Sequence, residues 1–411
     1  MTWSFETDAD FQESLDWIDT FTKEEIEPLD LVFREPGDPW DPNSPAAAAM
    51  APLREIVKAK RLWACHLEPE LGGQGYGQVA LGLMNEILGR SRFGPSVFGC
   101  QAPDSGNAEI LAKFGTDDQK ERFLKPLLNA EIASCYSMTE PQAGADPGEF
   151  LCTATRDGDE WVINGQKIWT STAHHADWIF CLVRTEPNAP KHLGISFLLF
   201  RMDTPGIEIR PLVDMTGDAN FNEVFFTDVR VPKDQIVGER GQGWQVANAI
   251  LGHERGSLAT PDAALNRLNG VARLMREESI NGTPIMDNPI FRDRLMKLEG
   301  RALAMQYNDM RLLSAKINKS QDVRLAAMIV KLAGTELRHE IECLGIDVMG
   351  EIGLGYGDNS HVRGHGAWQY QYMFYLGLII GGGTSQIQKN IISERGLGMP
   401  KEPKIPAASA K

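Results

Sequence analysis

The spacing of apolar residues changes character twice along this chain. Residues 1–130 carry apolar positions three and four apart, as in QVALGLMNEILGRS and DDQKERFLKPLLNAE, which is the spacing of one helix face. Residues 131–240 contain short β-branched and aromatic runs such as EWVINGQKIWTST and NEVFFTDVRVP, which are typical of strands. Long helical segments return over residues 241–400. The pattern predicts an α+β protein with an N-terminal helical domain, a middle β domain and a C-terminal helical bundle, and residues 401–411 are expected to form a disordered tail.

Composition and charge narrow the class of protein. A chain of 411 residues with 42% hydrophobic and 24% charged residues fits a globular protein of two or three domains. The net charge of −15 argues against a nucleic-acid partner and disfavours an anionic membrane surface. The chain shows neither a signal-peptide pattern nor an apolar stretch of roughly 18 residues, and its six cysteines form no CxxC pair. We therefore expect a cytoplasmic protein with reduced thiols, no membrane span and no nucleic-acid partner.

Several common chemistries have no motif here. No glycine loop ends in GK[ST], no strand is followed by GxGxxG, and no GxSxG elbow occurs. The histidines offer only the pair His174–His175 and the spacing His361-x-x-x-His365. Isolated pairs of this kind usually belong to the surface or to packing, so no metal site is predicted.

One carboxylate falls on an apolar helix stripe. The segment WQVANAILGHERGSLA follows a Gly-rich turn, and one face of the helix that it predicts carries Ala247, Ile250, Leu251, Glu254 and Leu258. Burying a carboxylate there is unfavourable unless it is paired or has a task. Two interpretations remain open. Glu254 is either a structural ion-pair partner, for example of Arg255 or Arg294, or a desolvated general base whose pKa burial raises.

Two further segments combine polar and aromatic groups. CYSMTEPQAGADPGEF lies where helix gives way to strand, and Gly144 in it allows close backbone approach. INGQKIWTSTAHHADW places Trp169 beside three hydroxyl residues, an aromatic wall that suits a heteroaromatic ring with polar edges. Taken singly, each segment is better explained as an ordinary β-hairpin that has a core tryptophan.

Together these segments resemble the acyl-CoA dehydrogenase family of flavoproteins. The resemblance runs from about residue 50 to 399, through LEPELGGQGYG, the two segments above, NEVFFTDVRVPKDQIVGERGQGW and GGGTSQIQKNIISERGLGMP. It implies an N-terminal helical domain, a middle antiparallel β-barrel-like domain and a C-terminal four-helix bundle. It also implies FAD, bound between the middle and C-terminal domains and usually reaching a second subunit of a homodimer or homotetramer.

The resemblance assigns the flavin-facing residues one by one. The expected cofactor-binding residues are Met138, Thr139, Gly144, Ala145, Trp169, Ser171, Thr384 and Gln386. The usual serine of the family is Ala145 here, which leaves one hydrogen bond to flavin phosphate or substrate without its side chain. DVMGE at residues 347–351 stands where the family often has Gln-x-x-Gly-Gly. The usual arginine before FGxP is also missing near EESINGTP, so the second-subunit half of the FAD site departs from the pattern.

The family pattern also indicates which residue is the catalytic base. Many members carry a catalytic glutamate where this chain has Gly382, and a minority place it before an arginine on the first helix of the C-terminal bundle, as in Glu254–Arg255. The resemblance therefore implies that Glu254 removes the α-proton of an acyl-CoA thioester while the β-hydride passes to the flavin. Arg255, Gly382 and Gly383 are expected to contact the substrate, and the Gly382 N–H to polarise its carbonyl. An electron-transferring flavoprotein would take the electrons.

Three other functions are compatible with the same fold. One is an acyl-CoA oxidase or another flavin reaction, in which dioxygen replaces the protein acceptor. The others are a non-catalytic subunit paired with an active homologue, and a DNA-associated member of the superfamily. The presence of Glu254, Trp169 and Thr384 argues against the non-catalytic subunit, and the net charge of −15 argues against the DNA-associated member. The sequence does not identify the acyl group of the substrate. The displaced glutamate is found among members that act on long, branched or bulky acyl groups.

Overall fold

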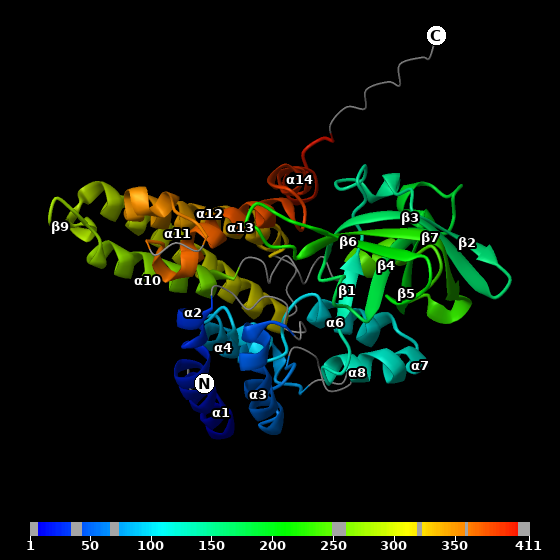
Figure 1. Ribbon diagram of the computed structural model, residues 1–411, viewed down its shortest axis with the longest axis horizontal. Helices are drawn as coiled ribbons and strands as arrows, with labels where there is room; N and C mark the ends of the chain where they lie inside the picture. Colours follow the sequence, from blue (N-terminus) through cyan, green and yellow to red (C-terminus); the bar gives the residue numbers. More distant parts are fainter. Residues whose placement is uncertain are drawn as a thin grey trace, which may run out of the picture.

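The chain folds into three regions that match the three textures of the sequence. The computed structural model describes residues 7–33, 43–65, 74–248, 260–318, 323–357 and 361–401. Blue and cyan helices, a green sheet and a yellow-to-orange helical bundle occupy separate parts of the molecule (Figure 1). The predicted α+β architecture is confirmed.

Helices build the N-terminal region. They are α1 (Ala9–Phe21), α2 (Leu29–Val32), α3 (Pro45–Ala59), α4 (Gly77–Leu88), α5 (Gly94–Val97), α6 (Asp104–Phe114), α7 (Asp117–Gln119) and α8 (Lys125–Leu128). Capping side chains determine the residue at which several of these helices begin. The Ser44 hydroxyl accepts from the Ala47 N–H with Pro45 in the first turn of α3, and Thr116 and Gln119 form a reciprocal capping box at α7.

One mixed sheet forms the middle region. Its strands are β1 (Ser134–Ser137), β2 (Thr153–Asp157), β3 (Glu160–Ser171), β4 (Trp178–Arg184), β5 (Ile195–Arg201), β6 (Ile207–Leu212) and β7 (Phe221–Pro232). The path is β1-β4-β2-β3-β7-β6, with β5 beside β4. The prediction of an antiparallel domain is right for most pairs and wrong for two, because β1–β4 and β2–β4 are parallel. A helix-to-sheet entry strand such as β1 is not part of a hairpin, so no turn forces it to be antiparallel.

A β-bulge interrupts β3 just before its end. Lys167 pairs with Val224 on β7 and Thr170 pairs with Asn222, so three steps on β3 oppose two on β7. The extra residue reverses the in–out alternation of the strand. Lys167 and Thr170 therefore both face inward, while Trp169, with φ of 61°, is 55% exposed.

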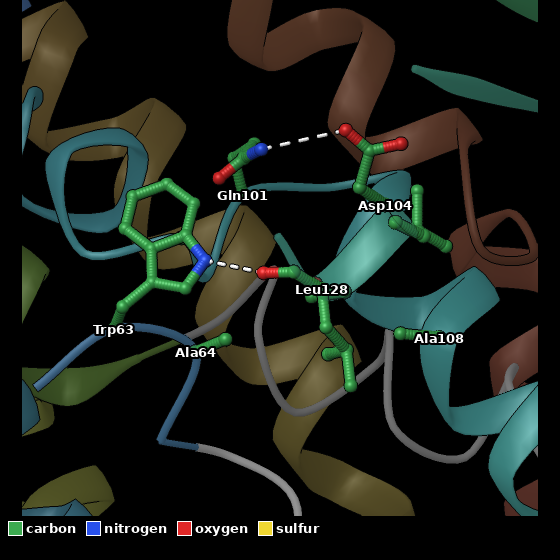
Figure 2. Close-up of a pocket in the computed structure, with 9 residues that line it drawn as sticks. Trp63, Ala64, Gln101, Asp104, Ala108 and Leu128 are labelled. Carbon is green, nitrogen blue, oxygen red and sulfur yellow. Dashed lines mark hydrogen bonds between the residues drawn. The ribbon is translucent and has the colours of Figure 1, made fainter. Parts of the chain in front are cut away.

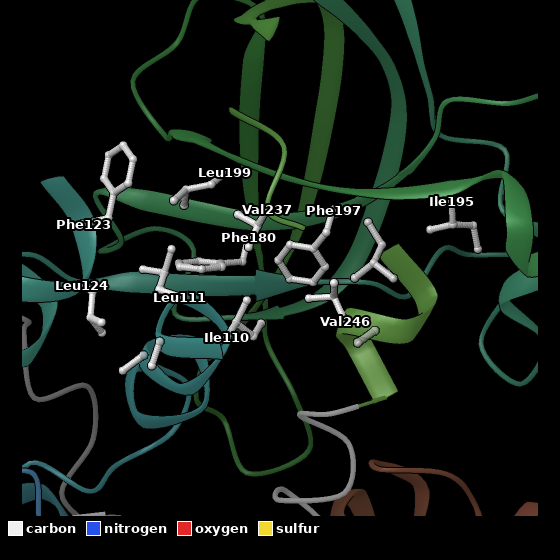
Figure 3. Close-up of a cluster of buried hydrophobic side chains, with 14 of the residues drawn as sticks. Ile110, Leu111, Phe123, Leu124, Phe180, Ile195, Phe197, Leu199, Val237 and Val246 are labelled. Atoms are coloured by element: carbon white, nitrogen blue, oxygen red, sulfur yellow. The ribbon is translucent and has the colours of Figure 1, made fainter. Parts of the chain in front are cut away.

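A shared apolar core joins the N-terminal helices to the sheet. Ile110 and Leu111 of α6 and Phe123 contact Phe180 of β4 and Phe197 of β5 (Figure 3). The N-terminal and middle regions are therefore one packed unit on this side, which fixes the sheet against the helices.

Among the residues that the structure describes, four helices form the C-terminal bundle, in agreement with the prediction. They are α10 (Pro261–Glu277), α11 (Pro289–Ile317), α12 (Arg324–Met349) and α13 (Ala367–Ile380), followed by the short helix α14 (Ser385–Ile391). A buried ion pair crosses the bundle, since Arg267 of α10 donates to both carboxylate oxygens of Glu342 on α12. The same guanidinium lies 3.4 Å from the ring centroid of Trp368 on α13, so one side chain ties three helices together.

Candidate functional site

Trp169 presents a flat aromatic face at the end of the sheet. Its ring stands edge to face with Phe221, with 6.1 Å between centroids. It is more than half exposed, so the alternative of a core tryptophan does not hold. The neighbouring Ser171 hydroxyl makes no hydrogen bond to any residue that the structure describes, and is therefore free to bind a polar ring edge.

The segment Met138–Thr139 follows β1 directly and lies beside β3. The Thr139 carbonyl accepts from the Ile168 N–H at 2.9 Å, which places Thr139 close to the bulge that carries Trp169. Within the described part of the chain, neither the Thr139 N–H nor its hydroxyl has a hydrogen-bond partner. Two donors are thus available at this point.

Hydrogen bonds to Asp146 hold the turn that follows Thr139. Gly144 and Ala145 are both exposed. The next residue, Asp146, accepts from the Gly148 N–H at 2.8 Å and from Lys191 Nζ at 2.9 Å. The hydrogen bond from Lys191 lowers the pKa of the Asp146 carboxyl, so this tie persists over the neutral pH range.

Two glycines of the C-terminal loop need the conformation that only glycine adopts easily. Gly382 has φ of 64° and Gly383 φ of 94°, a region that is unfavourable for other residues. The Gly382 carbonyl accepts from Gln388 Nε2 at 2.9 Å, whereas the Gly382 N–H donates to no described residue. This loop therefore offers an unpaired backbone donor on a fixed backbone.

Thr384 and Gln386 behave differently from one another. The Thr384 hydroxyl caps α14 by accepting from the Ile387 N–H at 3.2 Å. The Gln386 side chain is exposed and has no hydrogen-bond partner among the described residues. Gln386 is thus free for a ligand, while the Thr384 side chain already has a structural role.

A buried lysine holds the glycine loop from beneath. Lys331 on α12 is 1% exposed, and its ammonium donates to the carbonyls of Ile379 and Gly383 at 2.9 and 2.8 Å. Ser385 adds a bond to Glu336 on the same helix at 2.9 Å. The loop is therefore pinned to α12 at both ends.

The middle region and the bundle meet beside these segments. The Tyr356 hydroxyl donates to the Thr216 carbonyl at 2.7 Å. Thr216 belongs to the connection between β6 and β7, which extends from the sheet toward α13 (Figure 1). Since Phe221 at the end of this connection contacts Trp169, the flavin-facing candidates of the sheet lie on the side that faces the bundle.

The predicted base lies outside the described residues. Glu254 and Arg255 both fall in the gap between residues 248 and 260. The helical residues 243–248, which precede this gap, bury Ala247 completely, in agreement with its place on the predicted apolar face. Arg294, one suggested partner of Glu254, instead donates to Asp347 at 2.7 Å.

Two cavities among the described residues are lined by none of the residues expected to contact the flavin or the substrate. One holds about 10 Å³ between Trp63, Gln101 and Asp104 (Figure 2), room for about one water molecule. The other, about 270 Å³, lies beside Glu351 and His361, next to the DVMGE segment.

The described residues contain no cluster of three or more His, Cys, Asp or Glu side chains arranged to hold a metal ion. They also contain no helix that is both long and apolar enough to cross a membrane.

Sequence reasoning missed the charged residues beneath the site. Lys167 and Glu140 form a buried ion pair at 2.8 Å, and Lys331 is equally buried. A signal was present for each lysine. Lys167 has the same strand parity as the core residues Trp161 and Ile163, and Lys331 lies in the apolar run AAMIVKLAG.

Comparison with known families covers almost the whole chain. The N-terminal, middle and C-terminal domains of acyl-CoA dehydrogenases match residues 9–131, 135–229 and 241–397. The chain belongs to the acyl-CoA dehydrogenase family. Members of this family are oxidoreductases that act on CH–CH groups, and the resemblance inferred from the motifs is confirmed.

Individual relatives support the same assignment. The acyl-CoA dehydrogenase IpdE1 of Mycobacterium tuberculosis (strain ATCC 25618 / H37Rv) is 39% identical over 314 residues, covering 74% of this chain and 78% of the relative. IpdE1 of Mycolicibacterium smegmatis (strain ATCC 700084 / mc(2)155) is 33% identical over 382 residues, covering 85% and 91%. A chain of the ChsE4-ChsE5 complex from Mycobacterium tuberculosis superposes with a TM-score of 0.78 at 26% identity, covering 97% of this acyl-CoA dehydrogenase and all of that chain.

Proposed function

We propose that this acyl-CoA dehydrogenase binds FAD and converts an acyl-CoA thioester to its trans-2-enoyl-CoA, with Glu254 as the base. The observation that carries the proposal is the backbone at Gly382. It occupies the usual position of the family's glutamate, has φ of 64° and carries no side chain. A base must therefore come from elsewhere, and Glu254–Arg255 matches the alternative position of the family.

The described residues fit a flavin. Trp169 offers an exposed aromatic face, and Thr139, Ser171 and Gln386 offer polar groups that are unpaired among the described residues. Flat heteroaromatic rings with polar edges are bound by this combination. We assign Met138, Thr139, Gly144, Ala145, Trp169, Ser171, Thr384 and Gln386 to the FAD site. When bound, FAD supplies the acceptor for the hydride that leaves the β-carbon.

Each remaining step belongs to residues of this chain. The Gly382 N–H polarises the thioester carbonyl and so acidifies the α-proton. The Glu254 carboxylate takes that proton as the carbon–carbon double bond forms. Arg255 and Gly383 complete the substrate contacts, and the electrons pass on to an electron-transferring flavoprotein.

We infer that the chain works as an oligomer, since the family's FAD site usually reaches a second subunit. The exposed apolar side chains Met296, Tyr307 and Met310 on α11 provide surface for such contacts. A homodimer or homotetramer is the simplest assembly. A mixed assembly with a homologous subunit is the second candidate, because a structurally similar chain belongs to the ChsE4-ChsE5 complex and DVMGE departs from the family pattern. Light scattering of the protein purified alone separates them, because a homo-oligomer forms from this chain by itself whereas a mixed assembly needs the homologous subunit.

The test of the function combines FAD loading with a change at Glu254. The purified protein should show a flavin absorbance band near ~450 nm, and a scan of acyl-CoA thioesters with an artificial acceptor should find a substrate. In Glu254→Gln, the thioester should still bind and perturb the flavin spectrum, while flavin reduction slows by about 10³-fold or more. Glu277→Gln, a change at an exposed position on α10, is the matched control.

Three outcomes count against the proposal. A protein that takes up no FAD removes the central claim, and an undiminished reduction rate in Glu254→Gln removes the base. Peroxide formation at the rate of turnover in air, without another acceptor, would instead identify an oxidase.

A further inference from the structure

A buried ion pair lies directly beneath the two flavin-facing candidates of the middle region. Lys167 on β3 is 0% exposed and Glu140, next to Thr139, is 2% exposed. Lys167 Nζ donates to Glu140 Oε1 at 2.8 Å and to the Met138 carbonyl at 2.9 Å, and it lies 4.1 Å from the ring centroid of Phe150. The ammonium is therefore enclosed by a carboxylate, a carbonyl and an aromatic face.

The carboxylate of Glu140 is bonded on both oxygens. It accepts from the backbone N–H groups of Leu151 and Cys152 at 2.6 and 3.1 Å, and from Gln142 Nε2 at 2.6 Å. These bonds join the turn after β1 to the residues just before β2. Lys167 and Glu140 thus connect three separate segments of the middle region.

Stability alone does not explain such a pair. Removing two charges from water is so unfavourable that a buried ion pair is often no more stabilising than apolar side chains of the same size. What the pair adds is a defined geometry, because its hydrogen bonds are directional: the ammonium donates to two oxygens and faces the Phe150 ring, and both carboxylate oxygens accept. The pair therefore fixes the position of the backbone groups to which it is hydrogen-bonded.

The backbone that the pair fixes carries free donors on its other side. Carbonyl and N–H point in opposite directions across a trans peptide. Since the Met138 carbonyl points toward Lys167, the Thr139 N–H of the same peptide points away from it. That N–H and the Thr139 hydroxyl have no partner within the described ranges. On the other strand, Trp169 follows Lys167 by two residues and turns outward at the bulge.

We propose that the Lys167–Glu140 ion pair is a positioning device that sets the Met138–Thr139 peptide, and with it the Thr139 donors, against the Trp169 face. This role rests on the proposed flavin site. Neither Lys167 nor Glu140 needs to touch the cofactor, because both act through the peptide bond and the strand that they hold.

The test replaces the pair by neutral side chains of similar size. The double variant Lys167→Met/Glu140→Gln leaves no unpaired charge, so it is expected to fold. Its FAD dissociation constant should rise about tenfold or more, the size of one lost net hydrogen bond in a polar site. The absorption spectrum and the midpoint potential of the flavin that still binds should also shift. Lys233→Met is the control, because Lys233 pairs with Asp159 on the exposed surface of the same sheet at 2.6 Å.

The single variant Glu140→Gln keeps the bond from Lys167 to the Met138 carbonyl, so its FAD dissociation constant should lie between those of wild type and the double variant. Because it leaves the buried Lys167 ammonium without a carboxylate, it should be less stable than the double variant, and FAD is titrated below the melting temperature of each protein. If wild type binds FAD and the folded variants match it in affinity, spectrum and potential, the pair is only structural and the positioning role is wrong. A wild-type protein that binds no FAD contradicts the proposed function itself, and the positioning role falls with it.

Discussion

The indole of Trp368 on α13 lies directly against Gly345 on α12. A methyl group at Gly345 would stand 2.5 Å from the indole Cε3 atom, closer than such carbon atoms approach. The absence of a side chain at Gly345 therefore lets α12 and α13 pack together. Gly300 on α11 is the opposite case, because a methyl group there would meet no atom within 4 Å.

This contrast predicts opposite effects of one substitution. Gly345→Ala should lower the stability of the C-terminal bundle by about 1–3 kcal/mol, because overpacking outweighs the better helix propensity of alanine. Gly300→Ala should raise it by about 0.5–1 kcal/mol through propensity alone. Thermal unfolding of both variants checks the prediction. Equal shifts of the same sign would show that the Trp368 contact is not the cause.

Two tryptophans on β3 form a second matched pair. Trp161 is 2% exposed and Trp169 is 55% exposed, although the residues differ only in their place on the strand. Trp161→Ala should cost about 3–5 kcal/mol of stability. Trp169→Ala should change the stability of the apoprotein by no more than about 0.5 kcal/mol, while it weakens FAD binding. The two quantities are measured by thermal unfolding and by titration with FAD, and a strongly destabilised Trp169→Ala would contradict the exposed placement.

The domain order and most element positions could be predicted because hydrophobic periodicity is local. The sequence predicts long helical segments over residues 241–400, and α11 runs unbroken from Pro289 to Ile317 within that range. Periodicity alone places Trp169 on the wrong face of the strand. A period of two places it on the inner face with Trp161 and Ile163, and only the bulge between Lys167 and Thr170 turns it outward. The register of β7 decides where the bulge forms, and register is a property of two strands.

The candidate site also has some features that the sequence predicts and others that only the fold reveals. The glycine loop is visible in the sequence, and its positive φ angles explain the glycines at residues 382 and 383. The buried ion pair is different, because Lys167 and Glu140 are 27 residues apart in sequence, and the strand parity of Lys167 indicates burial without identifying its partner. Only the fold brings the two together. The base Glu254 remains a prediction from the motif.

Three carboxyl groups meet where α4, α10 and α11 pack. Burial, together with Glu86 and Asp309, raises the pKa of Asp262 to about 6, and burial also raises the pKa of Asp309. A carboxyl whose folded pKa exceeds its unfolded value of roughly 4 binds protons more readily in the folded state. Its contribution is therefore favourable at low pH and is lost as the pH rises from about 4 through about 6.

Asp262→Asn should remove this loss. At pH 7.5 the melting temperature should rise by about 1–3 °C, a small gain because solvent screens the partly exposed charges. Near pH 4 wild type and variant should converge, since Asp262 is then protonated in the folded state. Asp287→Asn, at an exposed position, is the control. A gain that is equal at both pH values would rule out titration of Asp262 as the cause.

The last prediction concerns Lys331 and the glycine loop. Lys331→Met removes the hydrogen bonds to the Ile379 and Gly383 carbonyls, which should lower stability by about 2 kcal/mol or more. The loop would then be held by Ser385, which donates to Glu336 of α12, and by Gln388, whose amide donates to the Gly382 carbonyl. Because the Gly382 N–H belongs to this loop, its orientation toward the thioester carbonyl should be disturbed as well. We therefore expect kcat to fall by about tenfold or more on the best substrate, while KM changes little, since an aligned donor contributes most in the transition state.

The control for Lys331→Met is Lys297→Met on α11, which removes an exposed ion pair with Asp293 at 2.7 Å. That variant should change stability by less than about 0.5 kcal/mol and leave kcat unchanged. Steady-state kinetics below the melting temperature of each variant separate the two effects of Lys331. If Lys331→Met lowers the melting temperature but turns over at the wild-type rate per folded molecule, Lys331 stabilises the bundle and does not position the Gly382 donor.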